Sequence, residues 1–162
     1  MIAAGRWNGR YDICICSMTP SKARAQVFDF PVTYYASPAV IVVNASDDRI
    51  HSAKDLSGLK VGVTSAASYE SYLNKDLVIE GAEDTPLEYP FDAVQVAPYD
   101  NDTVAFHDLA LGAGVRLDAI LTNLVTAQPR IDQDKRFKLA GKALYAAVSY
   151  THLRAHETRG NL

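Results

Sequence analysis

Residues 52–64 read SAKDLSGLKVGVT, and this stretch decides the fold class. Ser52 to Gly58 has the pattern of a short capped helix that ends at a glycine. Lys60 to Thr64 follows at once and has the apolar character of a buried strand. A helix that leads directly into a strand is the repeating unit of an α/β sheet, so the segments on either side show whether the unit recurs.

The same alternation continues in both directions from this stretch. Residues 39–43 form a continuous apolar run that is typical of a fully buried strand. Residues 65–68 open a helix over 69–73, and residues 80–91, rich in proline and carboxylates, indicate a loop. Further strands are expected at residues 93–96, 117–121 and 137–139, and further helices from the caps at 100–102 to Gly112 and from about Leu124, interrupted at Pro129. This order predicts an α/β fold with a mostly parallel sheet and helices on both faces.

The N-terminal part repeats the pattern once. Residues 12–16 alternate as a strand, Thr19 fits a helix N-cap, Pro20 fits the first helical position, and a short helix is expected through Arg24. The two cysteines, Cys14 and Cys16, lie two apart on this expected strand and therefore point to one face. That geometry disfavours a disulfide between them and favours a role in apolar packing.

Composition excludes two classes of partner. The 162 residues are 48% hydrophobic and 22% charged, with a formal net charge of −3. The charges form no basic stripe, so nucleic acid is not an expected partner. No apolar run approaches the roughly 20 residues of a membrane span. Residues 1–5 have neither the basic region nor the apolar core of a signal peptide.

Two of the predicted strands end in groups that suit an anion. Ser17 and Thr19 follow the first strand, and Ser68 follows the strand over 60–64. Arginine can bind a carboxylate through two parallel N–H bonds, and hydroxyls with free backbone N–H groups complete such a site. Ser17, Thr19, Arg24 and Ser68 could therefore hold one carboxylate. On pattern alone, a surface arginine beside a capped helix is the more frequent explanation.

The order of motifs resembles a known family, the extracellular solute-binding proteins of family 3. These are the polar-amino-acid receptors of bacterial ABC importers. The resemblance extends over about residues 5–147, and several motifs in the same order are far more specific than any one of them. The matching residues are Asn8-Gly9-Arg10-Tyr11-Asp12, Ser17-Met18-Thr19 with Arg24, Asp29-Phe30-Pro31 with Tyr34-Tyr35, residues 55–63, and Leu117-Asp118-Ala119-Ile120.

The resemblance implies a periplasmic-binding-protein-like (type 2) clamshell that traps a small amino acid or related carboxylate by hinge closure. Arg24 should pair with the ligand α-carboxylate, Thr19 and Ser68 should donate to it, and Ser17 should line the cleft. The family usually has aspartate, which holds the α-ammonium, where this chain has Asn123. Ala66 replaces a glycine expected at the mouth of the second site. No cofactor, metal or catalytic residue is implied.

The resemblance also implies a domain organisation. We expect part of lobe one at residues 1–40, with its N-terminal half missing. Lobe two, with a doubly wound mixed sheet, is expected at residues 41–141, a return hinge segment at 142–147, and a non-native read-through tail at 148–162. The parent protein is expected to be a periplasmic or extracellular monomer that delivers its ligand to a membrane permease, with the signal peptide absent from this fragment.

Two other functions stay open from the sequence. The same pair of lobes could be the sensor domain of a receptor, or a dehydratase-like enzyme. An enzyme would need a general acid in the cleft. Asn123 removes the most natural candidate, and His107 is expected to be exposed on a helix. His152 and His156 have the spacing of a helical zinc pair, but they lack a third ligand, and an artefactual tail is the favoured interpretation.

Overall fold

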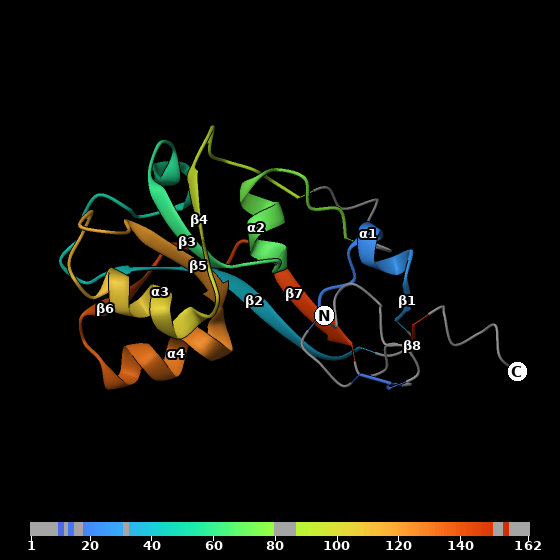
Figure 1. The fold of residues 1–162 in the computed structure, drawn as a ribbon. Coiled ribbons are helices and arrows are strands. Elements are labelled where there is room, and N and C mark those ends of the chain that lie inside the picture. The colour runs from blue at the N-terminus through green and yellow to red at the C-terminus, as the bar shows by residue number, and fades with distance from the viewer. Residues whose placement is uncertain are drawn as a thin grey trace, which may run out of the picture. The chain divides into compact units, whose positions relative to one another are not determined.

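The computed structural model describes residues 10–11, 13–14, 18–30, 33–79, 87–150 and 154–155, and for 33–35, 146–150 and 154–155 it describes the backbone only. The described chain divides into two compact units (Figure 1). Unit 1 comprises residues 1–37, 78–86 and 147–162, and unit 2 comprises residues 38–77 and 87–146.

Unit 1 holds short elements. Its helix α1 (Lys22–Ala25) leads into β1 (Phe28–Asp29), which pairs antiparallel with β8 (Arg154–Ala155). Phe28 is buried and packs edge-on against Phe30. Two longer strands belong partly to each unit, β2 (Thr33–Asn44) and β7 (Ala146–Tyr150), and they pair with each other.

Unit 2 alternates strands and helices as the sequence predicts. Its remaining elements, in chain order, are η2 (Ala53–Leu56), β3 (Lys60–Thr64), α2 (Ser68–Leu73), β4 (Gln95–Tyr99), α3 (Asp102–Leu109), β5 (Ala119–Asn123), α4 (Leu124–Gln133) and β6 (Phe137–Ala140). The strand predicted at residues 60–64 is confirmed to the residue, and Asn101 caps α3 through a bond from the Val104 N–H (3.2 Å).

The sheet is mixed. Its strand order is β4-β3-β5-β2-β6, with β7 also paired to β2. β3 runs parallel to β4 and to β5, whereas β2 runs antiparallel to both β5 and β6. The expectation of a mostly parallel sheet is therefore wrong at β2. The connection from β2 to β3 contains only the short η2 and not a full crossover helix, and it reverses the chain direction.

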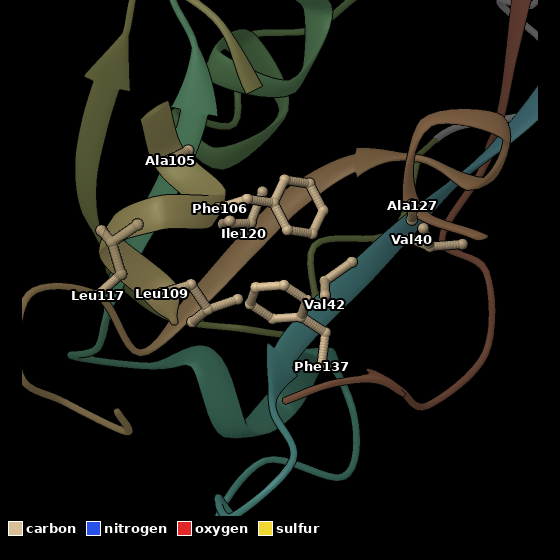
Figure 2. Packing of buried hydrophobic residues seen from close by; sticks show 9 residues of the cluster. All are labelled: Val40, Val42, Ala105, Phe106, Leu109, Leu117, Ile120, Ala127 and Phe137. Atoms are coloured by element: carbon tan, nitrogen blue, oxygen red, sulfur yellow. The ribbon is translucent and has the colours of Figure 1, made fainter. Parts of the chain in front are cut away.

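The core of unit 2 lies between the sheet and the helices α3 and α4. Val40 and Val42 of β2 belong to this core together with Ile120 of β5, and Phe106 and Phe137 pack edge-on at 5.1 Å between ring centroids (Figure 2). Ile41, Val43 and Leu121 alternate with these residues along their strands and are also buried. Both faces of the central strands are therefore covered, which confirms the prediction of a fully buried strand over 39–43.

An ion-pair network lies at the end of the sheet where the parallel strands β3 and β5 begin. Asp118, just before β5, accepts a bond from the Lys60 N–H at the start of β3 (2.9 Å) and pairs with Arg49 (2.8 Å). Arg49 also pairs with the buried Asp47 (2.8 Å), and this bond holds the pKa of Asp47 below its usual value. These residues lie where the parallel strands begin, so the polar groups at the amino edge of the sheet are paired with one another.

Two further local expectations are corrected. The α4 helix is not interrupted at Pro129 but continues to Gln133. Cys14 is disulfide-bonded, contrary to the prediction, and it lies in an isolated β-bridge and not in a continuous strand, so the strand geometry behind that prediction does not apply. Cys16 lies outside the described residues, as do His152 and His156.

Candidate functional site

In unit 1 the candidate site residues are Thr19 and Arg24. One guanidinium nitrogen of Arg24, Nη1, donates to the backbone carbonyl of Thr19 at 2.9 Å. Thr19 is buried, with 6% of its surface exposed, and Arg24 is half-buried. This bond restricts the orientation of the planar guanidinium group, which carries five N–H donors in a rigid fork. Thr19 thus positions Arg24 through its backbone.

The helix that carries Arg24 begins two residues later than the sequence suggested. Its N-cap is Ser21, whose side chain accepts from the Arg24 N–H at 3.3 Å, so Thr19 is not the cap and Pro20 precedes the helix. Both Thr19 and Ser21 are suitable capping residues. The remaining candidate of this segment, Ser17, lies outside the described residues.

In unit 2 the carboxyl end of β3 leads to Ala66 and Ser68. Ala66 has φ of +58°. This value lies in the left-handed region that favours glycine. The Ala66 N–H donates to Glu70 Oε2 at 2.7 Å, so a carboxylate of α2 holds the turn from its own helix. Ser68 is the first residue of α2 and is 7% exposed. The glycine position noted from the sequence is therefore a turn in which alanine is strained.

Ser68 is linked to Asn123 through neighbouring residues. Burial raises the pKa of the Tyr145 phenol well above its usual value, and the adjacent Ser68 hydroxyl opposes this rise. The Tyr145 carbonyl accepts from the Ala39 N–H at 2.7 Å, and Ala39 is paired with Asn123 across β2 and β5. The structure thus brings Ser68 and Asn123 to one region of unit 2, at the carboxyl ends of the adjacent parallel strands β3 and β5.

Asn123 ends β5 and caps α4. Its side-chain oxygen Oδ1 accepts from the Thr126 N–H at 2.8 Å, and its side chain is half-buried. In the part of the chain that the structure describes, its amide nitrogen Nδ2 makes no hydrogen bond. The capping bond therefore orients the amide, with its oxygen toward the start of α4.

Other polar groups at this edge lack partners. The Thr64 and Thr122 hydroxyls are buried at the carboxyl ends of β3 and β5, and neither makes a hydrogen bond to any described residue. Buried hydroxyls are normally hydrogen-bonded. The carboxyl edge of the sheet thus differs from the amino edge, whose polar groups satisfy each other.

Two residues of this region were missed from the sequence. Glu70 is four residues after Ala66, at the third position of α2, where a glutamate commonly reaches back to the start of its helix, so this signal was available. Tyr145 packs on Tyr72 at 4.9 Å between ring centroids, and no sequence pattern placed its ring beside α2.

Neither a metal site nor a membrane helix is found in the described ranges. No group of three or more His, Cys, Asp or Glu side chains there could hold a metal ion. Within the same ranges, the helices are all too short or too polar to cross a membrane.

The candidate residues thus form two groups, Arg24 with the buried Thr19 in unit 1 and the polar carboxyl edge of the sheet in unit 2. The family model of the bacterial extracellular solute-binding proteins, family 3, matches residues 2–158. The chain belongs to this family. Members of this family are binding proteins, and the resemblance stated from the motifs is confirmed.

Two proteins similar to this chain are named as amino-acid-binding proteins. The chain is 30% identical over 131 residues to the L-cystine-binding protein TcyJ of Escherichia coli (strain K12), covering 75% of the chain and 43% of that relative. It is 28% identical to an ancestral arginine-binding protein bound to arginine, with a TM-score of 0.73, covering 99% of the chain and 63% of that structure.

A third relative supports the fold. The arginine-bound form of truncated ArgBP from T. maritima has a TM-score of 0.77 at 23% identity, and the match covers 98% of the chain and 66% of that structure. The predicted periplasmic-binding-protein-like α/β fold with a mixed sheet is therefore confirmed. The chain spans less than half the length of the cystine-binding relative that it matches.

Proposed function

We propose that this solute-binding protein captures a small amino acid or related carboxylate between two lobes and releases it to the membrane permease of an ABC importer. Family membership and the names of the relatives support the binding role. We assign unit 2 to the second lobe and the α1 region of unit 1 to the first. The protein is expected to work as a monomer outside the cytoplasmic membrane.

The observation that carries the proposal is the fixed guanidinium of Arg24. A carboxylate is the anion that best matches the fork of an arginine, and a guanidinium already oriented by Thr19 loses less freedom on binding. We propose that Arg24 binds the ligand carboxylate, that Thr19 and Ser68 contribute donors, and that Ser17 and Ala66 line the site.

The proposed function involves no chemical step. None of the residues assigned to the site is a histidine or a carboxylic acid, which general acid catalysis would require. His107, the alternative weighed from the sequence, is exposed on α3, as predicted. A dehydratase-like activity therefore has no candidate acid among the assigned residues, and we favour binding alone.

The test is the replacement of Arg24 by alanine, read by calorimetry with a panel of amino acids and their 2-hydroxy and 2-oxo acid counterparts. Removing one partner of a desolvated charge pair should weaken binding roughly 100-fold. Lys22→Ala is the matched control, because Lys22 is an exposed cation on the same short helix. Binding that is equal in the wild type and in Arg24→Ala would refute the assignment of Arg24.

A further inference from the structure

Tyr145 is held beside α2 by its backbone and by its ring. Its carbonyl accepts from the Ala39 N–H at 2.7 Å, and the Leu144 N–H donates to the Ala39 carbonyl at 2.9 Å. Between centroids, its ring lies 4.9 Å from the ring of Tyr72 and 6.5 Å from that of Tyr69. All of these residues belong to unit 2, so this unit alone sets the position of the phenol.

The ring of Tyr145 packs on the part of α2 that carries Ser68. Ser68 and Tyr72 are four residues apart in this helix, so their side chains lie one above the other on one face. Both residues are buried, with 7% and 1% of their surface exposed. A ring that packs on Tyr72 and Tyr69 therefore lies beside the first turn of α2, where Ser68 is the first residue.

The Tyr145 hydroxyl is a buried polar group with incomplete hydrogen bonding. Tyr145 is 9% exposed, and its hydroxyl makes no hydrogen bond of full geometry to any residue that the structure describes. Burial raises the pKa of this phenol, and the adjacent Ser68 hydroxyl opposes the rise. Buried hydroxyls are normally hydrogen-bonded. The Ser68 oxygen is therefore the partner that unit 2 offers to this phenol.

The direction of a bond between the two hydroxyls decides what Ser68 can do. A serine hydroxyl has one proton to donate and two lone pairs with which to accept. If Ser68 donated to Tyr145, its proton would be used inside unit 2. If Tyr145 donates to Ser68, the serine proton can go to an anion at the carboxyl edge of the sheet, and each bond strengthens the other. A phenol is a stronger donor than an aliphatic alcohol, which favours the second direction.

We propose that Tyr145 is a positioning residue whose hydroxyl donates to Ser68 Oγ, so that the Ser68 O–H is directed at the carboxylate of the bound ligand. The inference rests on the proposed function, since it takes Ser68 as a donor to that carboxylate. It concerns residues of unit 2 alone. It adds a role for a buried residue that acts on the ligand through Ser68.

Calorimetry with L-alanine, L-glutamate, L-arginine and L-lactate, which share a carboxylate, tests this role. Tyr145→Phe keeps the ring and removes the hydroxyl. It should weaken the binding of those probes that the wild type binds by about 3- to 10-fold, the scale of one hydrogen bond. Ser68→Ala should weaken binding by at least as much, and Tyr145→Phe should cause no further loss in that background. Losses that add in the double variant would overturn the inference.

Tyr72→Phe is the matched control for the loss of a phenol hydroxyl. Tyr72 packs on Tyr145, but its own hydroxyl donates to the Glu88 carbonyl at 2.7 Å. The variant should lower the melting temperature and leave the affinity for the probes unchanged. A loss of affinity equal to that of Tyr145→Phe would show that the aromatic packing, and not the Tyr145 hydroxyl, supports binding, and would overturn the inference.

A second measurement needs no substitution at Tyr145. The NMR signal of a tyrosine Cζ responds to the hydrogen bonding of its hydroxyl. A saturating probe should shift the Tyr145 signal of the wild type, because the hydroxyl closes its bond to Ser68, and should leave it in place in Ser68→Ala. A signal that stays in place in the wild type, or that shifts equally in Ser68→Ala, would overturn the inference.

The outcomes separate this inference from the proposed function. Unchanged affinity in Tyr145→Phe, together with a loss in Arg24→Ala, would overturn the inference and leave the proposed function standing. Binding that does not depend on Arg24 would count against the proposed function. Failure of the wild type to bind any of these probes would overturn both.

Discussion

Replacement of Ala66 by glycine is expected to stabilise unit 2, although it removes a methyl group. Ala66 has φ of +58°. An L-residue in this left-handed region costs roughly 1–2 kcal/mol. Glycine avoids this cost but has more freedom in the unfolded chain, which offsets about 0.4–1 kcal/mol. The bond from the backbone N–H of residue 66 to Glu70 is kept in the variant. The net gain should be about 0.5–1 kcal/mol.

Thermal unfolding followed by circular dichroism measures this gain. For a unit of about 100 residues, the melting temperature should rise by about 2–8 °C. Lys75→Gly provides a second case, because Lys75 is the other non-glycine residue with positive φ in the part of the chain that the structure describes (+62°). Its melting temperature should rise as well.

The control is the same alanine-to-glycine change where φ is negative. Ala110 has φ of −66° at the C-cap of α3. Glycine there only adds freedom to the unfolded chain and should lower the melting temperature. If Ala66→Gly melted below the wild type, or if Ala110→Gly rose by as much, backbone strain would not be what distinguishes Ala66.

Two other changes test the fold that supports the site. Gly141 has φ of +71°, and a Cβ added there would lie 2.8 Å from the His51 carbonyl oxygen. Gly141→Ala should therefore cost about 2–4 kcal/mol in chemical denaturation. Gly58 has φ of +77° but nothing within 4 Å of an added Cβ. Gly58→Ala should cost no more than about 1 kcal/mol, and equal losses would contradict the predicted clash. Asp47 has its pKa lowered by Arg49, so its stabilisation is present above its unfolded pKa and is lost as the pH falls through the lower folded value. Asp47→Asn should flatten the acid limb of the stability–pH curve, and an unchanged limb would exclude this ion pair as its cause.

Local signals were sufficient for much of unit 2. β3 was predicted to the residue because a glycine ends the preceding helix and an apolar run follows at once. Helix starts at Asn101 and Asn123 follow from the same capping chemistry, since an asparagine side chain accepts the N–H groups that a helix leaves unpaired.

The sequence predictions of helix boundaries were wrong where the same residues fit two local structures. Thr19 and Ser21 can each cap a helix, and only the observed bond from the Arg24 N–H decides between them. Pro129 removes one helical hydrogen bond, to the Val125 carbonyl, and it lies on the exposed side of α4, where water can hydrate that carbonyl. The helix therefore continues past it, although proline usually predicts an end.

Strand direction is the feature that the sequence could not supply. An apolar run such as residues 39–43 fits a buried strand of either direction, because burial on both faces removes the period-two pattern. The antiparallel pairing of β2 with β5 places Ala39 opposite Asn123. The Ala39 N–H donates to the Tyr145 carbonyl, so the Tyr145 backbone lies next to the same pair of strands. The neighbourhood of Asn123 therefore depends on a pairing that no local pattern encodes.

The orientation of Asn123 marks the same limit at the level of one side chain. As a letter in the sequence, asparagine offers both a carbonyl oxygen and an NH₂ group, so it is compatible with a ligand ammonium and with a ligand oxygen. Only the structure, in which α4 begins at the next residue, shows that the oxygen accepts from the Thr126 N–H. The orientation of the amide thus follows from the helix that Asn123 caps and not from the residue type itself.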